Sequence, residues 1–84
     1  MVSELTSYNI RINAISAGPL PTLAARSIPG FSEMTRAHRE KSPLKRNINH
    51  NEVANTALFL ISDLSSGITG GTIPVDAGYG IIEL

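Results

Sequence analysis

The sequence predicts an α/β fold in which helices join parallel strands. An apolar run that begins at Ile10 has the β-branched spacing of a strand and stops at Gly18-Pro19. A long amphipathic helix pattern begins at Asn49, and a short strand-like segment follows it over residues 72–76. A strand, a helical crossover and a second strand, in that order, form the unit from which parallel sheets are built.

Two parallel strands do not make a satisfactory sheet alone, because each needs neighbours and cover on both faces. The 84 residues make at most one small domain, and such a chain buries only about 60–65% of its unfolded surface. We therefore predict that the chain is the end of a larger doubly wound domain.

The segments before the long helix are predicted to be short. Residues 2–7 read as the last turns of a helix, with Val2 and Leu5 on one face. Residues 22–28 predict a short helix, which Pro29-Gly30 interrupts. A second helix is predicted over 32–41 and a connecting loop over 44–48, because the residue before Pro43 leaves the helical region.

The long helix carries the clearest local signals. Asn49 can cap it, and Glu52 stands three residues on, which is a variant of the capping box. Apolar residues at helical spacing predict a wide buried face: Val53, Ala54, Ala57, Leu58, Leu60, Ile61 and Leu64. Residues 65–67 should stop the helix and residues 68–71 should form a tight turn. Pro74 predicts that the last strand lies at a sheet edge, and residues 81–82 are expected to dock onto another part of the fold.

Composition excludes several classes of function. The formal net charge is zero, so there is no electrostatic footprint for nucleic acid or for an anionic membrane. The chain has no cysteine, which excludes disulfides. It has no apolar run near the ~20 residues needed to span a bilayer and no signal peptide pattern, so we expect a cytoplasmic protein.

Basic residues gather locally at Arg36, Arg39, Lys41, Lys45 and Arg46. We interpret this basic cluster as a solvated face. The alternative is a surface that binds an acidic carrier protein or a phosphate.

The break after the first strand is the candidate binding site. A backbone group just after Pro19 can hydrogen-bond a planar amide at the strand end. The Thr22 hydroxyl, at a helix start, suits a pyrophosphate. On this pattern alone, the interpretation of Gly18-Pro19 as a simple strand terminator is favoured.

A longer pattern carries a family resemblance. Residues 13–25 read NAISAGPLPTLAA, and the similarity continues to DAGY at 76–79. This resembles the sixth-strand region of short-chain dehydrogenase/reductases, and most closely that of bacterial enoyl-acyl-carrier-protein reductases that use NADH. The resemblance implies a Rossmann-like doubly wound sheet, of which this chain would hold the last two strands and the intervening helices.

The resemblance also implies an activity and roles for residues. Members of the family reduce trans-2-enoyl thioesters on acyl carrier protein during fatty-acid biosynthesis, and they form homo-oligomers. Cofactor binding would fall to Gly18, Pro19, Leu20 and Thr22. The apolar substrate lid would be formed by Ala24, Ala25, Ile28, Phe31 and Met34. Pro21 departs from the family, which often has a basic residue there, and it removes one donor.

The chemistry itself is not predicted to reside in residues 1–84, which we interpret as a partial dinucleotide-binding domain. The family needs a Tyr and a Lys on one helix, but neither Tyr8 nor Tyr79 has a Lys at the usual spacing. The Gly-rich cofactor loop is also missing. His38 and His50 read as surface residues rather than metal ligands. The segment is expected to be inactive alone.

Two alternatives remain open at this point. The chain could belong to another short-chain reductase, such as a 3-oxoacyl-carrier-protein reductase. It could also be a non-catalytic oligomerisation module that pairs through Val53, Ala57 and Leu60 and through the strand at 73–75.

Overall fold

The computed structural model describes residues 2–80, except for the side chain of Leu5. Its helices are α1 (Val2–Thr6), α2 (Leu23–Arg26), α3 (Phe31–Lys41) and α4 (His50–Ile61), with a 3-10 turn, η1 (Asp63–Ser65). The strands are β1 (Ala14–Ala17) and β2 (Thr72–Val75). The two strands are parallel and in register from Ala14 opposite Thr72 to Ala17 opposite Val75. The predicted α/β class and parallel pairing are therefore confirmed.

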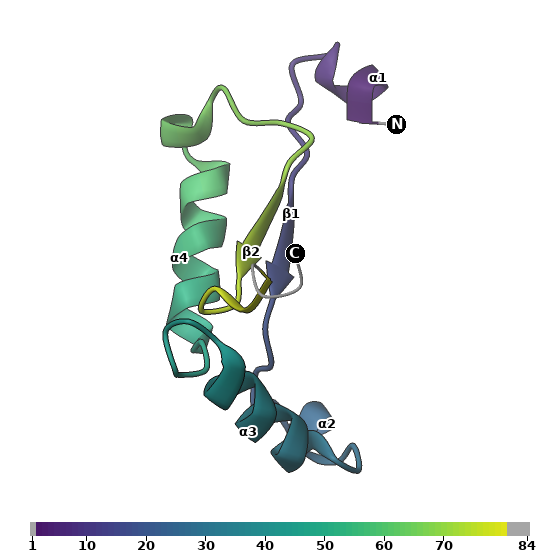
Figure 1. The fold of residues 1–84 in the computed structure, drawn as a ribbon. Helices are drawn as coiled ribbons and strands as arrows, with labels where there is room; N and C mark the ends of the chain where they lie inside the picture. The colour runs from purple at the N-terminus through teal and green to yellow at the C-terminus, as the bar shows by residue number, and fades with distance from the viewer. Residues whose placement is uncertain (1, 81–84) are drawn as a thin grey trace.

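Figure 1 shows how the elements are arranged around this small sheet. Helix α4 runs beside β1 and β2 and packs against both. Helices α2 and α3 lie beyond the carboxyl end of β1, and α1 lies beyond its amino end. The carboxyl ends of both strands therefore face the α3 side of the molecule.

Strand β1 is shorter than predicted, because only four residues pair with β2. Residues 10–13 precede the ladder, although the Ile12 carbonyl still accepts from Gly70 N at 2.7 Å. Ala14 N donates to the Gly71 carbonyl, just before β2, and Gly18 N, just after β1, donates to the Val75 carbonyl in β2, both at 2.9 Å. Since backbone groups alternate along a strand, those of Ile15 and Ala17 point to the opposite edge. None of the residues 2–80 pairs with that edge.

The start of α4 confirms the predicted capping box. The Asn49 side chain accepts from Glu52 N at 2.9 Å, and Glu52 Oε1 accepts from Asn49 N at 2.9 Å. The end of α4 differs from the prediction. The helix stops at Ile61, because the Ser62 hydroxyl bonds back to the Phe59 carbonyl and caps the separate turn η1.

The core within residues 2–80 is very small. Ile48 and Ala77 are its only buried apolar residues. The predicted buried face of α4 is largely uncovered: Leu58 is 62% exposed, Ile61 78% and Leu64 83%. This part of the prediction is wrong for the chain by itself, because one helix face exceeds what a two-stranded sheet can cover.

Arg11 and Asn13, just before β1, hydrogen-bond to the end of α4 and to the turn before β2. The Arg11 guanidinium donates to the carbonyls of Leu60, Ser62, Ser65 and Ile68 at 2.9 to 3.3 Å, and so closes the end of α4. The Asn13 amide donates to the Ile68 carbonyl and accepts from Gly71 N, both at 3.0 Å. These bonds fix the turn before β2 and hence the register of the sheet.

Candidate functional site

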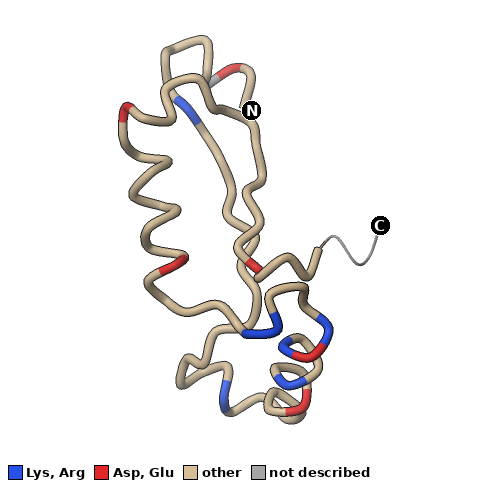
Figure 2. The backbone as a smooth tube through the Cα atoms, turned by 60° about the vertical axis from the view of Figure 1, so that its left-hand side comes forward, with Lys and Arg blue, Asp and Glu red and all other residues tan. Residues whose placement is uncertain are grey.

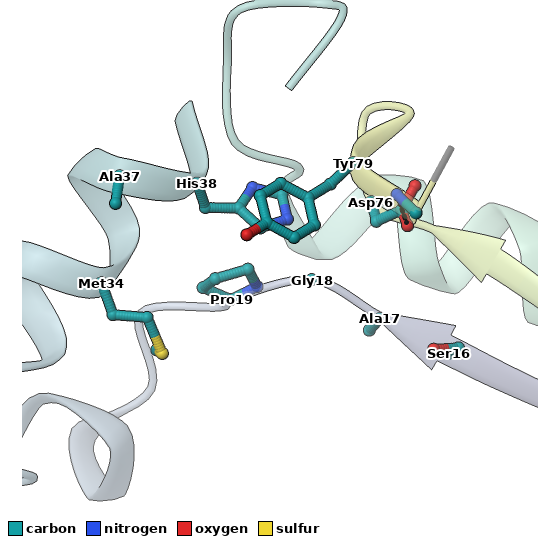
Figure 3. A pocket seen from close by; sticks show the side chains of 10 residues that line it. Ser16, Ala17, Gly18, Pro19, Met34, Ala37, His38, Asp76 and Tyr79 are labelled. Carbon is teal, nitrogen blue, oxygen red and sulfur yellow. Dashed lines mark hydrogen bonds between the residues drawn. The ribbon is translucent and has the colours of Figure 1, made fainter. Parts of the chain in front are cut away.

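A cavity of about 610 Å³ lies where the carboxyl ends of β1 and β2 face α3. Figure 3 shows its labelled walls: Gly18 and Pro19 on one side, Met34, Ala37 and His38 from α3 opposite, and Asp76 and Tyr79 from the turn after β2. Ser16, Ala17 and Gly80 complete the lining. In open parallel sheets, ligands bind outside the carboxyl ends of strands, and this cavity occupies that position.

Gly18 brings the strand end and α3 close together. A Cβ atom added at Gly18 would lie 3.2 Å from His38 Nε2 and 3.4 Å from the Cα of Asp76. The approach to His38 is tighter than ordinary van der Waals contact, and the approach to Asp76 is at its lower limit. A side chain at this position would therefore push the wall formed by α3 away from the strand.

The Asp76 side chain forms hydrogen bonds within its own turn. Its carboxylate accepts from Gly78 N at 3.0 Å and from Gly80 N at 2.9 Å. Gly78 adopts a φ of +87°, and a Cβ there would meet Pro43 at 3.0 Å. Asp76 thus shapes the turn that carries Tyr79 into the cavity wall, through side-chain-to-backbone bonds typical of aspartate at turns.

His38 is the main departure from the sequence prediction at this site. It was predicted at the surface, but it is only 8% exposed, and its ring stacks on Tyr79 with centroids 4.2 Å apart and planes 15° apart. The prediction was wrong because the partner ring belongs to Tyr79, which lies far from His38 along the chain. One local signal did exist: His38 stands four residues after Met34, on the same helix face.

The predicted site residues separate into two groups. Gly18, Pro19 and Met34 line the cavity. The other predicted residues do not line it: Leu20, Thr22, Ala24, Ala25, Ile28 and Phe31. They lie in or beside α2 and at the start of α3.

Thr22 acts locally as a helix cap. Its hydroxyl oxygen accepts from Ala25 N at 3.0 Å, which leaves the hydroxyl hydrogen available for another acceptor. Gly30 caps α3 with a φ of +83°, a left-handed conformation that glycine adopts without strain. The interruption predicted at Pro29-Gly30 is therefore confirmed.

The basic cluster lies away from the cavity lining. Figure 2 shows most lysines and arginines gathered around α3 and the loop that follows it, interspersed with acidic residues. All five residues of the cluster are exposed, as the solvated-face interpretation predicts. Arg46 makes a two-pronged ion pair with Glu52 at 2.8 and 2.9 Å, and this contact, with the Asn49 backbone, lowers the pKa of Glu52.

Residues 2–80 hold no group of three or more side chains that could bind a metal ion. No helix within this range has the length and apolar character needed to cross a membrane. Tyr79 packs on His38, and Tyr8 is 78% exposed.

The fold, with its strand-end cavity, is thus part of a Rossmann-like parallel α/β sheet. The family model described as "Enoyl-(Acyl carrier protein) reductase" matches residues 1–80, and the chain belongs to this family. This confirms the family predicted from residues 13–25.

Named relatives agree with this assignment. An NADH enoyl-[acyl-carrier-protein] reductase, FabI, of Nostoc sp. is 52% identical over 84 residues, which cover all of this chain and 33% of the relative. An NADPH FabI of Staphylococcus aureus is 52% identical over 80 residues, which cover 95% of this chain and 31% of the relative. The chain therefore spans about a third of the relatives that it matches.

Solved structures of relatives contain the same fold. The Bacillus cereus enoyl-acyl carrier protein reductase with NADP+ and indole naphthyridinone superposes with a TM-score of 0.92 at 46% identity. This match covers 99% of this chain and 32% of that one. The Anaplasma phagocytophilum reductase in complex with NAD gives a TM-score of 0.88 at 42% identity, with the same coverage. The prediction of a fragment of a Rossmann-like sheet is confirmed.

Proposed function

We propose that the chain is the carboxyl-terminal segment of an enoyl-acyl-carrier-protein reductase that uses NADH. The observation that carries the proposal is the 52% identity to such a reductase along the whole chain, together with an open cavity at the strand ends. The 3-oxoacyl reductase alternative lacks a comparable observation. The substrate would be a trans-2-enoyl thioester on acyl carrier protein, and the complete enzyme would be a cytoplasmic homo-oligomer.

The nicotinamide side of the site would be formed by the turn after β1. Gly18 and Pro19 line the cavity, and the absence of a Cβ at Gly18 lets the His38 ring pack against the strand end beside it. The backbone at Leu20 would meet the carboxamide. Thr22 would offer its free hydroxyl hydrogen to a phosphate oxygen while its oxygen caps α2. These features fit the coenzyme, which would supply the hydride for the β-carbon of the enoyl group.

The substrate lid would be formed by α2, the Pro29-Gly30 hinge and the start of α3. Met34 lines the cavity and is 51% exposed, so its flexible side chain can cover an acyl chain. Ile28 is 59% exposed, and Phe31 is half-buried at the first turn of α3. Ala24 and Ala25 would leave room for a thin acyl chain beside these larger residues.

The proton donor would come from the rest of the enzyme. This segment would bind, orient and cover the reactants, and by itself it would not reduce an enoyl thioester. The exposed apolar face of α4 and the open edge of β1 support this division, because both are surfaces that the complete oligomeric enzyme would cover.

The proposal can be tested in a chimaeric reductase. The 84-residue chain would replace the matching third of the Nostoc relative, and NADH oxidation with a trans-2-enoyl thioester would be measured. We expect activity within about tenfold of the relative's own. A folded chimaera that reduces only a 3-oxoacyl thioester, or neither substrate, would contradict the proposal.

A pair of glycine variants adds a matched control. Gly18→Ala should raise the KM for NADH by roughly tenfold, because the new methyl group would press on His38 and displace the α3 wall of the cavity. Gly67→Ala should leave the KM unchanged, since nothing lies within 4 Å of a Cβ at that position. Equal KM values for the two variants would argue against a coenzyme role for Gly18.

A further inference from the structure

Within helix α3, His38 is the only buried residue, while Met34 on the same face is 51% exposed. The helix also packs on α2, which is itself a helix of four residues without a buried side chain. Beyond the end of the helix, Leu44 N donates to the Ala77 carbonyl at 3.2 Å. His38 is therefore the buried contact by which α3 itself is held to the strand ends.

The His38 ring is held from two sides. Tyr79, on the turn after β2, stacks on it with centroids 4.2 Å apart. The strand end approaches it closely, since a Cβ on Gly18 would meet Nε2 at 3.2 Å and Cε1 at 3.3 Å. Figure 3 shows the two rings together above Gly18 and Pro19, with Met34 farther along α3. The ring thus joins the proposed lid to both strand ends.

The burial of this ring carries a free-energy cost that its packing must outweigh. His38 Nδ1 is buried and has no hydrogen-bond partner within residues 2–80. A buried polar atom without a partner disfavours the folded state, and an apolar side chain of similar shape would avoid that penalty.

From these contacts we propose that His38 is a positioning residue, which with Tyr79 anchors α3 over the strand-end cavity. This inference rests on the proposed function, since the helix it anchors is the proposed substrate lid. An anchored α3 keeps Met34 opposite Pro19, so the enoyl thioester enters a preformed slot. Without the anchor, only a fraction of molecules would hold the lid in place, and apparent affinity would fall by that fraction.

Kinetics of the chimaeric reductase test the anchor. His38→Ala should raise the KM for the enoyl thioester by roughly five- to tenfold and leave kcat within about twofold. His38→Phe, which keeps a ring to stack on Tyr79, should restore most of the affinity. Glu40→Ala is the matched control, because Glu40 is exposed on α3 and its side chain makes no hydrogen bond within residues 2–80. An unchanged KM for His38→Ala, or no rescue by phenylalanine, would overturn the proposal.

A second measurement does not depend on activity. Hydrogen exchange in the chimaera should rise at least about tenfold for the α3 amides in His38→Ala and in Tyr79→Ala, with no further rise in the double variant. Amides of α4 should be unaffected. If exchange rises in this way but the wild-type chimaera is inactive, the anchor stands and the proposed function fails. Unchanged α3 exchange in the single variants refutes the anchor whatever the activity.

Discussion

At Arg11, a single guanidinium joins the segment before β1 to the end of α4. It donates to the Ser65 carbonyl at 2.9 Å and to the Leu60 carbonyl at 3.0 Å, and the latter is one of the carbonyls that the end of α4 leaves without a helical N–H partner. We predict that Arg11→Met lowers the free energy of unfolding of the chimaera by about 2–3 kcal/mol. Arg11→Lys should not restore it, since an ammonium lacks the planar fork. Urea unfolding would measure both values, and full restoration by lysine would contradict this explanation.

Glu52 gives a second residue-scale prediction, which concerns pH. Its pKa lies below the ordinary value because Arg46 and the Asn49 backbone bond to its carboxylate. A lowered folded-state pKa stabilises the fold above the ordinary glutamate pKa, and the contribution is lost as pH falls through the lowered value. The melting temperature of the chimaera should therefore exceed that of Glu52→Gln at about pH 7, and the difference should shrink towards about pH 3. A pH-independent difference would contradict the ion-pair assignment.

At the scale of elements, α4 begins with a complete capping box but leaves its apolar face exposed. Leu58 is 62% exposed and Ile61 78%, although both belong to its apolar face. We predict that Leu58→Asp lowers the native mass of the chimaera by light scattering, because this face would be covered in an assembly. Asn55→Asp, an exposed change on the same helix, should leave the mass unchanged. Equal native masses for the unmodified chimaera and both variants would show that this face makes no contact between subunits.

Local patterns explain which elements could be predicted from the sequence. The capping box at Asn49, the stop before Pro43 and the helix break at Pro29-Gly30 each depend on neighbouring residues, and all three occur as expected. The burial of His38 and the bonds of Arg11 depend on partners more than forty positions away, which no local pattern contains. For the same reason the sequence identified Gly18 and Pro19 in the cavity wall but missed Asp76 and Tyr79.

At the scale of the whole molecule, the chain is more extended than its length requires. Its radius of gyration is 15.2 Å, whereas a compact chain of this length would have about 12 Å. Its accessible surface is 6093 Å², against about 4,900 Å² for a folded protein of this mass. The missing burial is what the other two thirds of an enoyl reductase would provide.

This extended shape yields a prediction for the isolated 84-residue chain. Its thermal melt should lack a cooperative transition, and excess NADH should not shift it, because the two strands and two buried apolar residues found within residues 2–80 make too small a core. The chimaera should melt cooperatively and at a higher temperature with NADH. A cooperative melt of the isolated chain that rises with NADH would contradict this view.

The open edge of β1 also bears on how long such a chain would survive in a cell. Backbone groups of Ile15 and Ala17 that no strand within residues 2–80 satisfies are a template for mispairing. A chain that is rarely compact is also readily cut by proteases. Its half-life in a pulse-chase experiment should lengthen when the complementary two thirds of an enoyl reductase are co-expressed. Its abundance would then follow that of its complement, which amounts to dosage control without a dedicated regulator.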